Sequence, residues 1–260
     1  MHKIYSVDGS VMKINVALLC VIVIPATSMA SANNVNGLSI GAGAAIAQSP
    51  YKDYDNDVQA LPQVMYEGEN LWIRGLGAGY YLWNTDEDKL SATVYWAPFK
   101  FKPDDSSDKQ LKRLDNRKST TMAGFTYTHM TSYGFLRAAV AGDVLGNSEG
   151  MTGSVGWMYP WSVGGINFLS GAGVEFADSK QNNYYYGISR KESRRSGLSA
   201  YDAGSSWSPY LELNAAYSIN EDWKVNIALR YLHLSDEVTD SSMVDKTWTG
   251  FLSTGVTYTF

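Results

Sequence analysis

Most of this chain consists of segments of about ten residues in which apolar or aromatic residues alternate with small or polar ones. The clearest segment is the last, where Leu252, Val256, Tyr258 and Phe260 share one face and small or hydroxylated residues share the other. Successive side chains of a strand point to opposite faces, so this pattern predicts strands with one apolar and one polar face. A series of such strands separated by polar turns is typical of a transmembrane β-barrel.

The charged residues within these segments indicate which face meets lipid. Each lies opposite the branched and aromatic residues of its own segment. A Lys or Arg that faces lipid near the bilayer midplane costs about 2–4 kcal/mol, so the polar faces are predicted to point into the lumen. We expect six residues to line the interior and to pair across it, with a narrow pore as the alternative. They are Arg74, Arg137, Asp143, Glu175, Glu212 and Arg230.

Eleven segments show the alternation, and they bound the number of strands. They lie near 36–47, 58–67, 70–82, 89–99, 119–130, 135–144, 151–160, 166–176, 207–218, 223–235 and 247–260. Bacterial barrels normally have an even number of strands, so one segment is missing or one is surplus. We predict an all-β, antiparallel outer-membrane β-barrel of twelve strands, with ten as the alternative. Residues 184–188, which include three tyrosines, are the candidate for the missing strand or for part of a structured loop.

The lengths of the connections predict how the barrel is oriented. With the C-terminus in the periplasm, the short connections 131–134, 162–165 and 219–222 become periplasmic turns. The longer ones, 100–118, 146–150, 177–206 and 237–246, become outer loops. Short turns inside and long loops outside are the usual asymmetry of these barrels.

The N-terminal stretch has the features of a secretory signal peptide. Residues 16–25 are apolar, Lys13 precedes them, and Ala30-Ser31-Ala32 forms a small-x-small cleavage signal. We therefore predict a signal peptide over 1–32 and a transmembrane β-barrel over 33–260, with Met12 as an alternative start. Cys20, the single cysteine, lies in the leader and follows two leucines, a weak lipoprotein signal. The mature chain is thus expected to form no disulfide and no thiolate metal site.

The composition and the histidines argue against nucleic-acid binding and catalysis. The net charge is −5, which offers nucleic acid no electrostatic attraction. His129 and His233 are predicted on outward faces near strand ends, where they are more typical of membrane-interface residues than of a hydrolase. We predict neither an enzyme nor a cofactor.

One acidic stretch resembles the start of a calcium loop. Asp53, Asp55 and Asp57 alternate, but Val58 and Val64 stand where such a loop has glycine and glutamate. A solvated acidic turn is the better interpretation, and we predict no metal site.

Two surface sites are predicted from residue type. Arg190, Lys191, Arg194 and Arg195 form a basic cluster in the longest loop, where they could bind lipopolysaccharide phosphates. The alternative is a solvated loop with Glu192 as the internal partner. The terminal pattern Val256, Tyr258 and Phe260 is similar to the signal that the barrel assembly machinery reads on its clients, so that machinery is an expected partner.

Longer motifs carry a resemblance to a known family. They include PYKDYD at 50–55, RGLG at 74–77, GYYLWN at 79–84, LDNRKST at 114–120, YYYGISRKES at 184–193, WSPYLEL at 207–213 and LSDEVTDS at 234–241 followed by MVDK at 243–246. Taken in order over nearly the whole mature chain, they resemble the MipA/OmpV family of outer-membrane proteins. Ser242 departs from the pattern, which has proline there.

The resemblance implies a function as well as a fold. Such proteins are described as scaffolds that join a membrane-bound lytic murein transglycosylase to a bifunctional penicillin-binding protein, so that the sacculus enlarges without rupture. It implies no active site and no binding residues to transfer. A small-solute or antibiotic-permeable pore is the alternative function. The expected partners act in the periplasm, where the predicted topology leaves only the short turns and the N-terminal stub.

Overall fold

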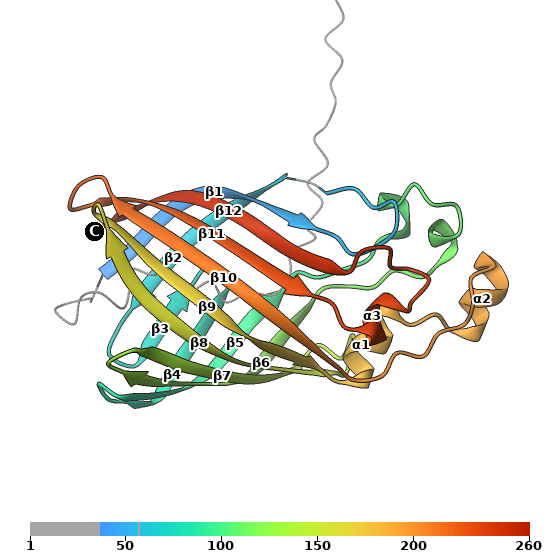
Figure 1. Cartoon of the computed structure of the whole chain (residues 1–260), viewed down its shortest axis with the longest axis horizontal. Helices are drawn as coiled ribbons and strands as arrows, with labels where there is room; N and C mark the ends of the chain where they lie inside the picture. Colours follow the sequence, from blue (N-terminus) through green and yellow to red (C-terminus); the bar gives the residue numbers. More distant parts are fainter. Residues whose placement is uncertain (1–36, 57) are drawn as a thin grey trace, which may run out of the picture.

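The computed structural model describes residues 37–56 and 58–260, and within them it forms a closed antiparallel barrel (Figure 1). Twelve strands follow one another around the wall in chain order, and β1 closes against β12. The predicted fold class and the strand number of twelve are confirmed. The predicted signal peptide, 1–32, lies outside the described residues.

The strands are β1 (Gly37–Gln48), β2 (Val58–Glu67), β3 (Leu71–Arg74), β4 (Gly77–Asn84), β5 (Asp88–Ala97), β6 (Thr120–Thr131), β7 (Gly134–Asp143), β8 (Met151–Val163), β9 (Ile166–Ala177), β10 (Ser206–Ser218), β11 (Trp223–His233) and β12 (Trp248–Thr259). The helices are α1 (Ser179–Tyr186), α2 (Arg190–Ser196) and α3 (Asp236–Thr239), with 3₁₀ turns η2 (Pro103–Asp105) and η3 (Leu111–Arg113). All of these helices and 3₁₀ turns lie in loops at one end of the barrel (Figure 1).

The two ends of the barrel differ in the length of their connections. Five turns, 68–70, 85–87, 132–133, 164–165 and 219–222, lie at the end that also holds Phe260. Loops 49–57, 98–119, 144–150, 178–205 and 234–247 lie at the other end. This is the asymmetry expected from the sequence, and it makes the first end the periplasmic one.

The strand missing from the eleven segments is in 70–82, which holds two strands instead of one. Gly75 turns the chain with a φ of +58°, and β3 and β4 pair from Leu71–Tyr80 to Arg74–Gly77. Of the two alternatives for 184–188, the missing strand is wrong and part of a structured loop is confirmed. Residues 184–186 end helix α1, and Ile188 forms an isolated bridge with Tyr201. Asp178 caps this helix by accepting a hydrogen bond from the Gln181 backbone N–H at 2.8 Å, which favours the helix over a strand.

The seam between β1 and β12 brings together residues far apart in the sequence. Pairing runs from Ser39–Thr259 to Gln48–Gly250. The two backbones approach closely at Gly41, where a Cβ atom would lie 2.0 Å from the Val256 carbonyl oxygen. Glycine is therefore required there for the barrel to close.

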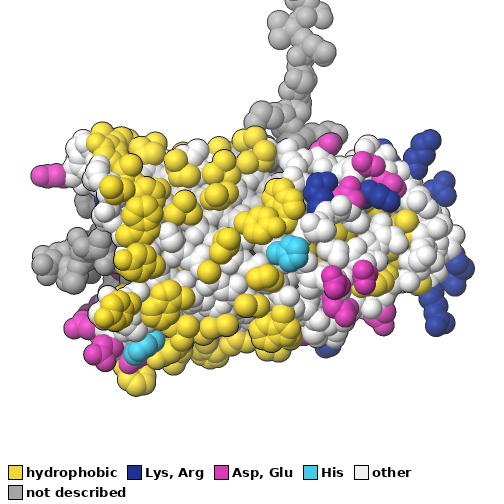
Figure 2. Space-filling view, viewed as in Figure 1, with side chains coloured by type: hydrophobic (Ala, Val, Ile, Leu, Met, Phe, Trp, Pro, Cys, Tyr) yellow, Lys and Arg dark blue, Asp and Glu magenta, His cyan; other side chains and the backbone are white. Residues whose placement is uncertain are grey.

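The outer wall carries the apolar band of a membrane barrel (Figure 2). Leu229 and Leu252 are exposed on it, while Ser253 on the opposite face is buried. Exposed tryptophans stand near both strand ends, as in the aromatic girdles of such barrels. They include Trp83, Trp161 and Trp223 near the turns and Trp207 and Trp248 near the loops. None of the helices in the described ranges is long and apolar enough to span a membrane.

Candidate functional site

Four charged residues form an ion-pair network inside the barrel. Arg137 Nη2 donates to Glu212 Oε1 at 3.1 Å, and Arg230 Nη1 donates to Glu212 Oε2 at 3.0 Å. Arg230 also pairs with Glu175. The pairing predicted for these four residues is confirmed, and all four come from the polar faces of β7, β9, β10 and β11.

Tyr210 completes this network and depends on two glycines. The Arg230 guanidinium lies 3.8 Å from the centre of its ring, a close cation–π contact. A Cβ at Gly156 would lie 2.2 Å from the Tyr210 hydroxyl oxygen, and one at Gly173 would lie 2.7 Å from its Cζ. The absent side chains on β8 and β9 thus leave the space that the ring occupies.

The other two predicted lumen residues have different partners. Arg74 Nη2 donates to Glu67 Oε2 at 2.7 Å and to the Tyr81 hydroxyl at 3.1 Å. Asp143 does not join the ion-pair network. Its carboxylate accepts hydrogen bonds from the backbone N–H groups of Leu145 at 2.9 Å and Ser148 at 2.6 Å. It therefore orders loop 144–150, because a carboxylate at a strand end can satisfy the backbone donors of the turn that follows.

Apolar side chains fill the lumen on the periplasmic side of this network. Phe135, Met158 and Leu169 are fully buried and belong to the largest hydrophobic cluster. On the outer side of the network lies a cavity of about 210 Å³, whose walls include Arg137, Glu175 and Arg230.

Four loops form an outer cap, defined here as the described residues of 49–56, 98–119, 178–205 and 234–247. Its core is apolar and includes Tyr51, Phe101, Leu111, Ile188 and Met243, all almost fully buried. The rings of Tyr51 and Phe101 are 4.8 Å apart, and those of Phe99 and Tyr185 are 4.6 Å apart. The cap is therefore a packed layer, and its apolar core belongs to the same hydrophobic cluster as the buried apolar residues of the lumen.

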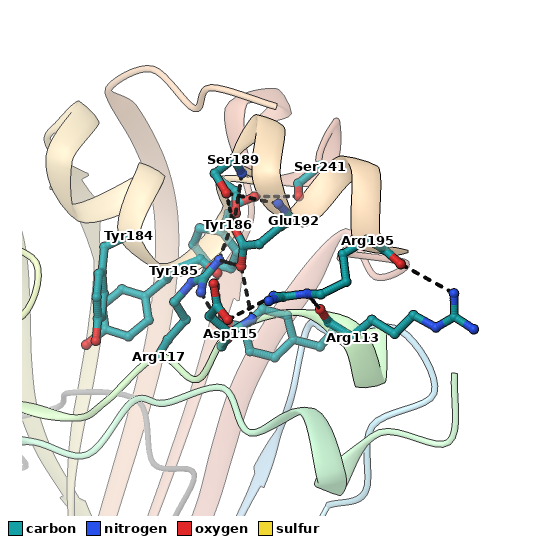
Figure 3. Close-up of polar contacts among 12 residues, drawn as sticks. Arg113, Asp115, Arg117, Tyr184, Tyr185, Tyr186, Ser189, Glu192, Arg195 and Ser241 are labelled. Atoms are coloured by element: carbon teal, nitrogen blue, oxygen red, sulfur yellow. Dashed lines mark hydrogen bonds and ion pairs between the residues drawn. The ribbon is translucent and has the colours of Figure 1, made fainter. Parts of the chain in front are cut away.

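A buried ion pair holds two of these loops together (Figure 3). Arg117 Nη2 donates to Glu192 Oε1 at 2.7 Å, and the Asp115 backbone N–H donates to the same oxygen at 3.0 Å. Ser189 and Glu192 form a capping box at the start of α2. Burial alone would raise the pKa of Glu192, but the hydrogen bonds from Asp115, Arg117 and Ser189 outweigh it and lower that pKa to about 2.

The predicted basic cluster lies on α2, at the tip of the cap. Arg190, Lys191, Arg194 and Arg195 are all exposed. Arg195 Nη2 lies 2.8 Å from Asp115 Oδ1 (Figure 3), and Lys112 and Arg113 of η3 add charge beside it. Glu192 points inward to Arg117, so it is not the partner of the cluster. Figure 2 shows Lys and Arg gathered at this end, and contact with lipopolysaccharide stays a prediction.

Acidic residues gather at the opposite end and form what we call the periplasmic rim. Its five turns expose Glu69, Asp86, Glu87, Glu221 and Asp222 and contain no Lys or Arg. Figure 2 shows acidic groups at the end away from the cap, and others on the cap itself. These residues were not predicted as a site from the sequence, although the pairs Asp86-Glu87 and Glu221-Asp222 in two short turns were an available signal.

The two histidines lie at opposite ends of the barrel. His129 Nδ1 is 2.8 Å from Asp88 Oδ1 at the periplasmic end, on a side chain that is 43% exposed. His233 is exposed at the other end of the barrel, where it pairs in register with Trp248. The predicted position near strand ends is confirmed for both.

The described part of the acidic stretch, residues 53–56, lies in the cap. The Asp53 backbone oxygen accepts hydrogen bonds from Ser107, and Asp57 is outside the described residues. Across residues 37–56 and 58–260, no group of three His, Cys, Asp or Glu side chains is placed to hold a metal ion.

The predicted assembly signal lies at the periplasmic end of β12. Val256 faces outward, and the Tyr258 ring lies 5.1 Å from that of Trp223 and 5.0 Å from that of Phe260. Phe260 is 76% exposed. Its recognition by the barrel assembly machinery stays a prediction.

Comparison with known proteins identifies the family. The family model described as MltA-interacting protein MipA matches residues 40–260. The chain belongs to the MltA-interacting protein family. It is 54% identical over 243 residues to the MltA-interacting protein of Escherichia coli K12, covering 94% of this chain and 98% of that one.

More distant relatives agree with this membership in the MltA-interacting protein family. The chain is 37% identical to YiaT of Escherichia coli K12, over 96% of this chain and all of that one. It is 26% identical to the outer membrane protein OmpV of Vibrio cholerae, over 80% and 81% of the two chains. With the closed barrel, these relatives make the chain an outer-membrane protein, as the sequence predicted.

Proposed function

We propose that this protein is a non-catalytic outer-membrane scaffold whose periplasmic rim docks a lytic murein transglycosylase. The observation that carries the proposal is the 54% identity, over nearly the whole of both chains, to a protein named for its interaction with MltA. The charge of the rim supports it. Five exposed carboxylates without a basic residue in the same turns form a negative surface, which suits a partner with a basic patch.

The scaffold would hold its partner through charge more than through shape. The turns are two to four residues long, so they cannot build a groove. Charges at the edge of an interface mainly accelerate encounter and select among partners. We further propose that a bifunctional penicillin-binding protein joins the same complex, which would couple cutting of murein to its synthesis.

The test is binding of a purified lytic transglycosylase to the folded barrel in detergent, measured by surface plasmon resonance. Reversing four rim charges, Asp86→Lys, Glu87→Lys, Glu221→Lys and Asp222→Lys, is expected to weaken binding at least about tenfold, or about 1.4 kcal/mol. The matched control reverses charges at the cap, Arg190→Glu, Lys191→Glu and Arg194→Glu, and is expected to leave binding unchanged. Equal loss in both variants, or no binding by the folded barrel, would overturn the proposal.

The proposed recruitment of a bifunctional penicillin-binding protein has a separate test. Immobilised barrel carrying bound transglycosylase is expected to retain a bifunctional penicillin-binding protein that the barrel of an unrelated family does not retain. Retention that is the same on both barrels would contradict the three-component scaffold.

The alternative function, a small-solute pore, needs the lumen to open. The ion pairs of Arg137, Glu212 and Arg230 cross the interior, and the outer cap packs above them. A conducting state would therefore require these groups to move. Steady single-channel conductance in planar bilayers would favour the pore over the scaffold.

We also infer that the basic cluster on α2 contacts phosphate groups of lipopolysaccharide. Guanidinium groups pair well with phosphate, and Arg190, Lys191 and Arg194 are exposed at the tip of a helix held by a buried ion pair. Replacing the three by glutamine is expected to reduce lipopolysaccharide binding to the folded barrel. Unchanged binding would assign them to a solvated surface.

A further inference from the structure

The cavity of about 210 Å³ inside the barrel has features of a ligand site that the scaffold function does not use. The ion-pair network forms one side of it, and Phe99, Tyr185 and Tyr186 of the outer cap form another. It is smaller than the roughly 300–1,000 Å³ of pockets for drug-sized ligands, which limits an occupant to about the size of one sugar ring.

The wall of this cavity carries more basic than acidic groups. Arg74, Arg137 and Arg230 line it, but Glu175 is its one acidic lining residue. The carboxylates of Glu67 and Glu212 pair with these arginines from positions outside the lining. A molecule in the cavity would therefore meet three guanidinium groups and one carboxylate.

Hydrogen-bonding groups without partners lie in the same wall. Arg137 Nη1, Arg230 Nε and Thr126 Oγ1 are buried and have no hydrogen-bond partner among the described residues. The two arginines are 9% and 5% exposed. A buried donor left unsatisfied costs about 1–3 kcal/mol, so these atoms favour an occupant that supplies acceptors.

We propose that this cavity binds a small hydroxylated carboxylate of the sugar-acid class. The carboxylate would accept from Arg137 and Arg230, since charge-assisted hydrogen bonds to guanidinium are the strong ones. The hydroxyl groups of the ligand would hydrogen-bond to Thr126, Ser154 and Asn182 in the wall. The sugar ring would lie beneath the aromatic side chains of the cap. This inference is independent of docking at the periplasmic rim.

The first experiment compares two probes of matched shape on the full barrel in detergent. Isothermal titration calorimetry with D-glucuronate is expected to show saturable binding, and D-glucose, which lacks the carboxylate, is expected to bind at least tenfold more weakly. Equal binding of the two would overturn the role of the carboxylate, and binding of neither would overturn the site itself.

The second experiment assigns the binding to the named residues. Thr126→Val removes an unpartnered hydroxyl without touching an ion pair, and it is expected to weaken glucuronate binding two- to fivefold. Arg137→Gln leaves Glu212 paired with Arg230, and it is expected to weaken binding tenfold or more. Lys191→Gln on the cap surface serves as the control. Glucuronate affinity unchanged in both cavity variants, with folding verified by heat-modifiable migration, would contradict the site.

Discussion

The two ends of this barrel differ in the length, packing and charge of the connections between its twelve strands. At the outer end, four loops build a cap with an apolar core around Tyr51, Phe101 and Met243, and a buried ion pair holds α2 to the loop 98–119. At the periplasmic end, turns of two to four residues bury almost nothing and display exposed carboxylates. The outer cap is thus a packed layer that carries both charges, with its exposed basic cluster on α2, and the turns of the periplasmic rim carry only negative charge.

This difference predicts which property, stability or association, a mutation at each end should change. A change to the Arg117–Glu192 pair of the outer cap should alter stability, because these two charges are buried and hydrogen-bonded. A change on the periplasmic rim should alter association, because its charges face water. The predictions that follow separate these two effects, beginning with the largest.

Loss of Phe260 should have the largest effect of all, at the level of assembly. If the exposed terminal ring and Tyr258 are read by the assembly machinery, deleting Phe260 removes most of the barrel from the outer membrane. Western blotting of heat-modifiable protein in membrane fractions measures this. In vitro refolding into detergent should be unchanged, and equal losses in both assays would point to a structural defect instead.

Breaking the buried pair of the outer cap should follow. Glu192→Gln leaves the Arg117 charge without its partner, which is expected to destabilise the packing of loops 98–119 and 178–205 by about 3 kcal/mol. Hydrogen exchange of these loop amides measures the loss. Arg195→Gln is the matched control, because its pair with Asp115 is more than a third exposed and is worth less than about 1 kcal/mol. Equal protection in the two variants would contradict the role of burial.

The same pair should make the outer cap sensitive to acid. The pKa of Glu192 falls from an ordinary 4.5 to about 2 in the folded cap, so its contribution is complete above pH 4.5. That contribution is lost as the pH falls from about 4.5 to 2, and it amounts to at most about 3 kcal/mol. The pH dependence of cap proteolysis by pepsin, compared between wild type and Glu192→Gln, isolates it. Parallel profiles for the two proteins would refute the assignment.

Salt should act on the periplasmic rim and spare the outer cap, and this is the smallest of the four effects. Screening lengths fall from about 10 Å at 0.1 M to about 3 Å at 1 M, so transglycosylase binding should weaken up to about tenfold over that range. Amide protection in the cap should not change, because the Arg117–Glu192 pair is buried. Salt-independent binding would mean that contacts other than the rim carboxylates hold the partner.

Sequence alternation was enough to predict the barrel and its charged lumen. It located eleven segments, and the rule of an even strand number made the prediction twelve. Lipid forces every strand to keep one face apolar. The charged residues Arg137, Glu212 and Arg230 must therefore face the lumen. The two strands within 70–82 were predicted as one segment because apolar residues continue through the turn between them. Trp72 faces inward before Gly75 and Tyr81 after it, so the inward positions change from even to odd numbers there. That change of phase was the available signal.

The outer cap was harder to predict because its contacts join segments far apart in the chain. The three tyrosines at 184–186 favour a strand by propensity, yet α1 forms since Tyr185 packs against Phe99 in another loop. The start of α2 was readable, because Ser189 and Glu192 have capping-box spacing. Nothing local indicated that Arg117 would be the partner of Glu192, seventy-five residues away. The unpartnered groups of the cavity likewise depend on the closed barrel.

The seam between β1 and β12 also governs when this protein can become stable. Ser39 and Thr259 are 220 residues apart in the chain, and their strands supply the pairing that turns an open sheet into a barrel. Every earlier species keeps two unpaired edges, which are templates for aggregation. Loop-closure entropy must be overcome before this distant pairing yields any gain, so the last step is intrinsically slow. The stability of the barrel therefore depends on one pairing between strands at opposite ends of the described chain, and any species that lacks this pairing is prone to associate with other chains.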